Sequence, residues 1–162
     1  MKNRIGQGVD VHQLLAGAPL IIGGVSIPYS KGSKGHSDGD VLYHAIVDAI
    51  LGALSMGDIG LHFPSDDDRW KDVNSRKFLE QAQYLMKEKG FVAVNIDATI
   101  IIQEPRLSSS IEKMRENIAS ILSISIDSVS VKATTTDHLG FTGSGKGIAA
   151  MAIALLTEID EK

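Results

Sequence analysis

The chain has 162 residues, a formal net charge of −4, 43% hydrophobic and 22% charged residues, and no cysteine. This length and composition predict one globular domain over residues 1–162, and the missing cysteine excludes disulfides and thiolate metal ligands. The acidic balance argues against a nucleic-acid partner. No apolar run approaches the ~20 residues of a membrane span, and no secretory signal follows Met1, so we expect a cytoplasmic protein without a membrane partner.

Hydrophobic periodicity predicts the regular elements. Short alternating or apolar runs indicate strands at residues 4–12, 20–27 (two short strands about Gly23-Gly24), 95–103 and 128–133. Apolar residues at helical spacing indicate helices at residues 41–54, 76–89 and 108–122. Residues 28–35 and 57–73 are expected to be loops, and the apolar run 148–159 fits either a strand or a helix.

Two residues of metal-ligand type, Asp10 and His12, end the first predicted strand. Side chains at i and i+2 of a strand project from the same face, so both can reach one point in space. His44, near the start of the following helix, would complete a set that leaves a fourth position open on zinc. The alternative is a turn aspartate and two hydrogen-bonded histidines. Asp48, one helical turn after His44, is either a carboxylate that fixes the His44 tautomer or a solvated charge.

Two polar segments are candidates for phosphate contacts. His36-Ser37 precedes a helix start, where free backbone N–H groups favour an anion, although an ordinary N-cap explains the same residues. Thr134-Thr135-Thr136 could donate hydroxyls to phosphate beside Asp137 as a ligand of Mg²⁺, or could simply end a strand. Gly140, Gly145 and Lys146 satisfy the P-loop spacing, but Gly147 stands where that motif needs Ser or Thr.

Taken in order, these segments resemble one family, the 2-C-methyl-D-erythritol 2,4-cyclodiphosphate synthases of the non-mevalonate isoprenoid pathway. The residues that carry the resemblance run through nearly the whole chain: Gly8-Val9-Asp10-Val11-His12, His36-Ser37-Asp38-Gly39-Asp40 with His44, Gly57-Asp58-Ile59-Gly60, Phe63-Pro64, Lys132-Ala133-Thr134-Thr135-Thr136 and Leu139-Gly140-Phe141-Thr142-Gly143.

The resemblance implies a reaction in which the 2-phosphate of a cytidine-diphospho-methylerythritol substrate attacks the β-phosphorus and releases CMP. It implies zinc on Asp10, His12 and His44, a second cation (Mg²⁺ or Mn²⁺) on Asp137, and transition-state stabilisation by His36 and Thr135. The implied substrate contacts are Asp10, Val11, His12, His36, Ser37, Asp58, Ile59, Gly60, Phe63, Pro64, Ser65, Asp66, Asp67, Ile102, Gln103, Glu104, Pro105, Arg106, Leu107, Ser108, Thr134, Thr135, Thr136, Asp137, Phe141 and Ser144.

The resemblance also implies an α+β fold, in which a mixed sheet carries helices on one face, and a homotrimer with active sites between subunits. That fold favours a strand for residues 148–159. The chain departs from the family's common residues at Asp137 (commonly Glu), Ser144 (often Arg), Lys146 (commonly Glu) and Ser65 (commonly Asp). Two other functions fit parts of the sequence: a zinc-dependent phosphohydrolase at the same Asp/His/His set, and a non-catalytic nucleotide-binding module.

Overall fold

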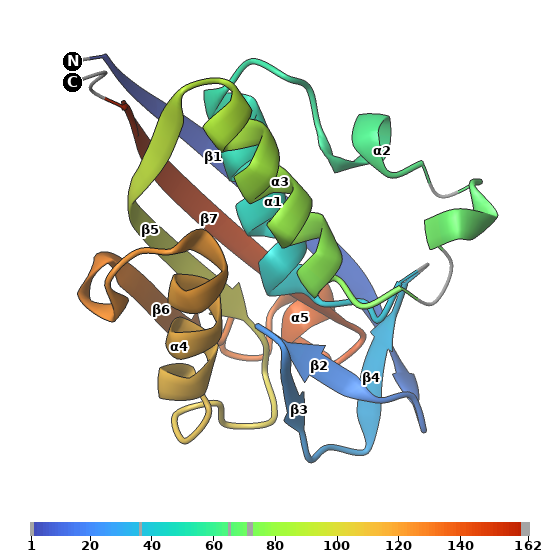
Figure 1. The fold of residues 1–162 in the computed structure, drawn as a ribbon. Helices are drawn as coiled ribbons and strands as arrows, with labels where there is room; N and C mark the ends of the chain where they lie inside the picture. Colours follow the sequence, from blue (N-terminus) through green and yellow to red (C-terminus); the bar gives the residue numbers. More distant parts are fainter. Residues whose placement is uncertain (1, 36, 65, 71–72, 160–162) are drawn as a thin grey trace.

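The computed structural model of the chain describes residues 2–35, 37–64, 66–70 and 73–159 (Figure 1). The described elements are, in chain order, β1 (Asn3–Ala16), β2 (Leu20–Ile22), β3 (Val25–Ile27), β4 (Lys31–Lys34), α1 (Val41–Ala53), α2 (Ile59–His62), the 3₁₀ turn η1 (Asp68–Trp70), α3 (Arg76–Glu88), β5 (Phe91–Ile101), α4 (Ile111–Leu122), η2 (Ile126–Ser128), β6 (Val129–Thr134), α5 (Gly140–Gly143) and β7 (Gly147–Glu158).

A five-stranded sheet in the order β4-β1-β7-β5-β6 forms the centre of the fold. Only β5 and β6 run parallel, so the sheet is mixed as expected. The apolar run that fitted either a helix or a strand forms β7, which pairs with β1 on one side and β5 on the other. The side chains of β7 are apolar on both faces of the strand, although one face is exposed, and this lack of polar alternation explains why its period was ambiguous.

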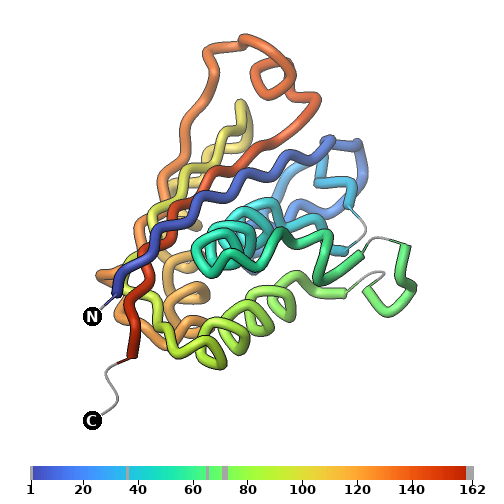
Figure 2. The backbone as a smooth tube through the Cα atoms, turned by 90° about the horizontal axis from the view of Figure 1, so that it is seen from above, coloured from blue at the N-terminus to red at the C-terminus, as the bar shows by residue number. Residues whose placement is uncertain are grey.

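The three long helices, α1, α3 and α4, lie on one face of the sheet, as Figure 2 shows in the view from above. α1 lies against β1 and β7, α4 packs on β6, and α3 packs on α1 and α4. The sheet beneath α1 consists of small residues, with Gly6 and Gly8 on β1 paired with the buried Ala154 and Ala152 on β7. Because these residues have little or no side chain, the helix backbone comes close to the strands.

The opposite face of the sheet carries exposed apolar side chains and is covered by no helix of the described residues. Ile5, Val9 and Val11 on β1 are 73%, 51% and 52% exposed, and Met151 and Ile153 on β7 are 40% and 47% exposed. Contiguous exposed apolar surface on a folded chain marks an interaction site more often than it marks an ordinary surface.

Several boundaries differ from the sequence-based expectation. Residues 31–34 form β4 rather than loop, because they pair with the unexpectedly long end of β1. The segment 57–73 contains α2 and η1 among its described residues. β5 begins at Phe91 with an irregularity between Ala93 and Asn95, and α4 begins at Ile111 after a turn. Each difference arises from pairing or turn formation that hydrophobic periodicity does not record.

Candidate active site

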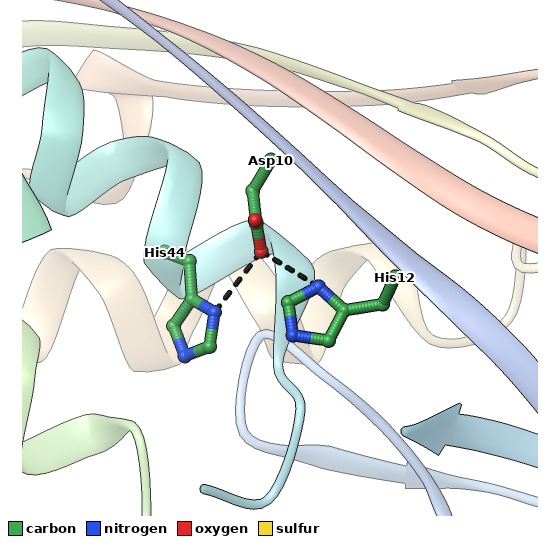
Figure 3. A group of neighbouring side chains, drawn as sticks. All are labelled: Asp10, His12 and His44. Atoms are coloured by element: carbon green, nitrogen blue, oxygen red, sulfur yellow. Dashed lines mark hydrogen bonds and ion pairs between the residues drawn. The ribbon is translucent and has the colours of Figure 1, made fainter. Parts of the chain in front are cut away.

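Asp10, His12 and His44 meet at one point between the sheet and α1 (Figure 3). Asp10 Oδ2 lies 2.9 Å from His12 Nδ1 and 3.0 Å from His44 Nδ1, and one ligand atom from each residue lies within 4.8 Å of the others. His44 is 8% exposed. The i, i+2 reasoning for Asp10 and His12 is therefore confirmed, and Val11 between them carries its side chain to the exposed face.

The start of α1 is fixed by Asp40, which lies one turn before His44. Its buried carboxylate accepts hydrogen bonds from the N–H groups of Gly23 (2.9 Å), Gly24 (2.7 Å) and Tyr43 (3.1 Å). It therefore caps the helix and also ties the β2–β3 turn to it. Burial raises the pKa of Asp40 from 3.8 to about 6, although the three N–H donors act in the opposite direction.

The donor set fits a divalent transition metal. His12 Nδ1 is buried and makes no hydrogen bond in the described structure, although it lies 2.9 Å from Asp10 Oδ2. A buried ring nitrogen aimed at a carboxylate without hydrogen-bond geometry is the arrangement of two ligands that share an ion. Burial raises the Asp10 pKa, but His12 and His44 outweigh it and hold that pKa well below its usual range. Asp10 is therefore ionised at neutral pH, as a candidate metal ligand must be.

The second ring nitrogen of His44 faces away from Asp10 and meets serine hydroxyls. His44 Nε2 lies 2.9 Å from Ser75 Oγ and 3.2 Å from Ser37 Oγ. The hypothesis that Asp48 fixes the His44 tautomer is wrong for this structure. Asp48 Oδ1 instead accepts the Ile59 N–H at 2.7 Å, which anchors α2 to α1.

A pocket of about 200 Å³ opens beside the triad. It is lined by His12, Ser37, His44, Ile59, Gly60, Phe63, Trp70 and Phe78. The rings of Phe63 and Phe78 lie 4.6 Å apart, and Trp70 stands edge-on to Phe63 at 5.0 Å. One wall is therefore aromatic and the other polar, which suits a small ligand with a carbon skeleton and charged substituents.

A second pocket, of about 360 Å³, lies where β5 and β6 end. Its lining includes eight expected contacts of the nucleotide: Ile102, Gln103, Pro105, Arg106, Leu107, Ser108, Thr134 and Thr135. A third hollow of about 240 Å³ adjoins it and includes Gln103, Glu104 and Ser144. The first two pockets have no lining residue in common, so one chain does not bring the triad and the nucleotide candidates into one cavity.

The remaining candidates have individual settings. Asp58 caps α2 by accepting the Leu61 N–H at 2.9 Å, and the partly buried Asp67 pairs with the exposed Arg69. Thr135 Oγ1 donates to Asp137 Oδ1 at 3.3 Å, and both residues are exposed. Asp137 joins no metal-type cluster among the described residues. His36 and Ser65 lie outside the described residues.

Sequence reasoning missed three residues at the triad: Ser75, Trp70 and Phe78. No local pattern identifies Ser75, because its contact with His44 joins positions 31 residues apart. The two aromatic residues had a usable signal, since large apolar residues in and after a long irregular segment often line a ligand cavity.

The fold and the site define a class: an α+β protein with a candidate metal centre next to a partly aromatic pocket, and with a separate polar pocket at the strand ends. A model of the YgbB family matches residues 3–157. The 2-C-methyl-D-erythritol 2,4-cyclodiphosphate synthase of Alkaliphilus oremlandii is 59% identical over 151 residues, which are 93% of this chain and 96% of that protein.

Solved structures agree with this match. The IspF–CDP complex of Plasmodium falciparum is 38% identical, with a TM-score of 0.86, and the match covers 98% of this chain and 97% of that one. The bifunctional IspDF of Campylobacter jejuni is 42% identical, with a TM-score of 0.94, and this chain spans 43% of its length. The chain belongs to the YgbB family of 2-C-methyl-D-erythritol 2,4-cyclodiphosphate synthases. No helix among the described residues is long and apolar enough to span a membrane.

Proposed function

We propose that this chain converts 4-(cytidine 5'-diphospho)-2-C-methyl-D-erythritol 2-phosphate to 2-C-methyl-D-erythritol 2,4-cyclodiphosphate and CMP, in the non-mevalonate isoprenoid pathway. The observation that carries the proposal is the Asp10/His12/His44 triad beside a pocket with an aromatic wall, in a chain of this family. The expected location in the cytoplasm and the single domain over residues 1–162 stay predictions.

The substrate supplies its own nucleophile. An oxygen of the 2-phosphate forms a bond to the β-phosphorus. The bond between the β-phosphorus and the oxygen that bridges it to the α-phosphate breaks, and CMP leaves with the electron pair of that bond. The attacking oxygen is already anionic, so the chain needs no strong base. Its work is to orient the two phosphates, which is worth roughly 7–11 kcal/mol in well-aligned intramolecular reactions.

Zinc is the proposed occupant of the triad, because two imidazoles and one carboxylate match its preferred ligands and leave a position open. When bound, it supplies Lewis-acid polarisation of a phosphoryl oxygen. The second proposed cation, Mg²⁺ or Mn²⁺ on Asp137, offsets the charge of the diphosphate. Asp137 is exposed and near the Thr135 hydroxyl, which supports a site that is open to a nucleotide phosphate.

The remaining roles are assigned to the chain's own residues. The backbone and side chains around Ile102 to Ser108 and Thr134 to Asp137 hold the cytidine diphosphate, and the aromatic wall at Phe63 receives the methylerythritol carbons. Thr135 and His36 donate to the phosphates as their charge shifts. The pocket at the strand ends supports this division, because polar groups and apolar walls converge there.

A homotrimer, with each active site between two subunits, is the proposed assembly. The exposed apolar face around Val9, Val11 and Ile153 supports it, because association would remove this surface from water. The separation of the two pockets also supports it, because the triad pocket of one copy could face the nucleotide pocket of the next. The number three comes from the family resemblance.

Phosphorus NMR tests the reaction directly. Purified protein with zinc and Mg²⁺ is expected to release CMP and a cyclic diphosphate, and chelation is expected to stop both. A phosphohydrolase would release linear phosphates instead, but it needs a free base beside the metal, and the described residues lining the triad pocket include no carboxylate. If metal-loaded protein bound the nucleotide without turnover, both enzyme functions would be excluded and a non-catalytic nucleotide-binding module would remain.

The histidine ligand has a matched control. His44→Ala is expected to abolish turnover. His62→Ala removes a histidine whose Nε2 contacts the Met56 carbonyl at 2.9 Å and which lies outside the triad, so its turnover should persist.

A further inference from the structure

His44 presents one ring nitrogen to Asp10 and the other to a buried serine. Its Nδ1 lies 3.0 Å from Asp10 Oδ2, and its Nε2 lies 2.9 Å from Ser75 Oγ. Ser75 is 0% exposed and precedes α3 in the chain, whereas His44 lies on α1. The contact therefore joins the starts of two helices behind the metal-type centre.

Ser75 is in turn bound to a carboxylate. Asp38 Oδ2 accepts the Ser75 backbone N–H at 3.1 Å, and Asp38 Oδ1 accepts a hydrogen bond from Ser75 Oγ. An ionised carboxylate can only accept hydrogen bonds, so the Ser75 hydroxyl proton must point to Asp38. The Ser75 oxygen then offers a lone pair to His44.

The direction of the Ser75 hydrogen bond bears on which nitrogen of the His44 imidazole carries the proton. Two groups can donate to that oxygen, His44 Nε2 at 2.9 Å and Ser37 Oγ at 3.1 Å, and the shorter contact assigns the donor role, and therefore a proton, to His44 Nε2. When a metal occupies the centre, Nδ1 would then keep its lone pair for the ion, which is the form of the imidazole that binds a metal. Ser37 Oγ, at 3.2 Å, is the more distant of the two hydroxyls at Nε2, and it also receives the Gly39 N–H at 3.3 Å.

The imidazole is also confined sterically. The Phe78 ring lies 5.8 Å from the His44 ring, centroid to centroid, and the His12 ring lies 5.2 Å away on the metal side. A ring held between two others has little room to turn, so the hydrogen bond to Ser75 selects both its orientation and its protonated nitrogen.

We propose that Ser75 and Asp38 form a relay that orients His44 as an Nδ1 metal ligand, which makes Ser75 a positioning residue of the metal centre. This inference rests on the metal-dependent function proposed above. Partners of this kind typically change metal affinity by 10- to 100-fold when they are removed. The relay also explains why a residue 31 positions from His44 is buried in the site.

Zinc affinity in competition with a chelator, measured without substrate, tests the relay. Ser75→Ala is expected to bind zinc about 10- to 100-fold more weakly than the wild type. Ser75→Thr keeps the hydroxyl and is expected to recover most of the loss. Ser33→Ala is the matched control, because Ser33 is a buried serine whose Oγ makes no hydrogen bond in the described structure. Its zinc affinity should be unchanged.

Asp38→Asn tests the polarity of the relay without removing the serine. An amide nitrogen facing Ser75 Oγ donates to it, which would turn the serine proton toward His44 and place the imidazole proton on Nδ1. Zinc affinity should therefore fall in this variant too. A second readout is the Nε2 proton of His44 in cobalt-loaded protein, which should exchange slowly with solvent in the wild type and quickly in Ser75→Ala.

The outcomes separate the two hypotheses. If the wild type binds zinc and both Ser75→Ala and Asp38→Asn bind it equally tightly, the relay is wrong and the metal centre stands. If the wild type itself binds no zinc, the metal-dependent function fails and the relay fails with it. Thermal unfolding in chelator identifies any variant that loses zinc only because it fails to fold, and the two independent substitutions keep the test decisive.

Discussion

Gly8 on β1 lies directly beneath Ala45 on α1, so closely that a Cβ on Gly8 would sit 1.9 Å from the Ala45 carbonyl oxygen. Gly8 is two residues before Asp10 on the same face of the strand, and Ala45 follows His44. This backbone contact therefore sets the 3.0 Å distance between Asp10 and His44. A metal-type centre built from a strand and a helix depends here on a residue that contributes no side chain.

Gly8→Ala is expected to destabilise the fold and to disrupt the triad together, because the methyl group must push α1 away from β1. Overpacking of this kind costs typically 1–3 kcal/mol. The midpoint temperature of thermal unfolding and the affinity for zinc would both be lower than in the wild type. Gly52→Ala on the same helix is the control, since its added Cβ would meet only the Gln7 carbonyl at 3.8 Å. Equal zinc affinity in Gly8→Ala and the wild type would contradict this explanation.

Asp40 is expected to make stability depend on pH in a defined window. Its pKa is raised by burial from 3.8 to about 6, so the folded state holds the Asp40 proton more tightly than the unfolded state does. The resulting stabilisation is complete below about pH 4 and is lost as the pH rises through about 6. One pKa unit is worth about 1.4 kcal/mol, so this contribution is about 3 kcal/mol.

Denaturant unfolding of metal-free wild type and Asp40→Asn measures that contribution. The advantage of the wild type over the variant should be larger at pH 4 than at pH 7, because only the wild type carries the titrating group. A constant difference across this range would count against the raised pKa. Asp40→Ala should be less stable than Asp40→Asn at every pH, because it leaves the N–H groups of Gly23, Gly24 and Tyr43 without an acceptor.

A charge placed on the exposed sheet face is expected to separate the subunits. Ile153 is 47% exposed, so Ile153→Asp should leave the single chain folded while burying a carboxylate in the proposed interface. Light scattering of this variant should show the mass of one chain. The variant should also lose turnover but still bind zinc. Tyr84→Asp on α3, at a side chain 54% exposed on the helical side, should stay trimeric. If the Ile153→Asp variant remained a trimer, this face could not be the interface.

Two inactive variants are expected to complement each other if the site lies between subunits. His12→Ala removes a triad ligand, and Thr135→Ala removes a hydroxyl of the nucleotide pocket. In trimers assembled from an equal mixture, about a quarter of the interfaces pair an intact triad with an intact nucleotide pocket, by the statistics of a closed ring. When the two variants are mixed and assembled together, turnover should recover to about a quarter of the wild-type value. No recovery would indicate that each chain holds a whole site.

The sequence predicted the parts of the site that depend on local periodicity. The two-residue repeat of a strand was enough to place Asp10 and His12 together, and helical spacing placed His44 in the first turn of α1. Periodicity failed for Asp48, which stands four residues after His44 but bonds to Ile59 rather than to the imidazole. A spacing of four permits a contact on a helix face without requiring it.

Long-range contacts account for most of what the sequence did not predict. The relay from Ser75 to His44 and the pairing of β4 with β1 both join residues that no local pattern connects. The central position of β7 was likewise invisible, because apolar residues on both faces remove the alternation that identifies a strand. The family resemblance supplied that element correctly, since it carries the whole topology rather than a local signal.

Zinc titration of metal-free protein tests the central claim, that the Asp10/His12/His44 triad holds the metal on which cyclisation depends. With Mg²⁺ and substrate present throughout, CMP and cyclic diphosphate should appear in proportion to added zinc and reach a plateau at one zinc per chain. His44→Ala should show no such rise. Full turnover by zinc-free wild type, or an unchanged titration in His44→Ala, would contradict the claim.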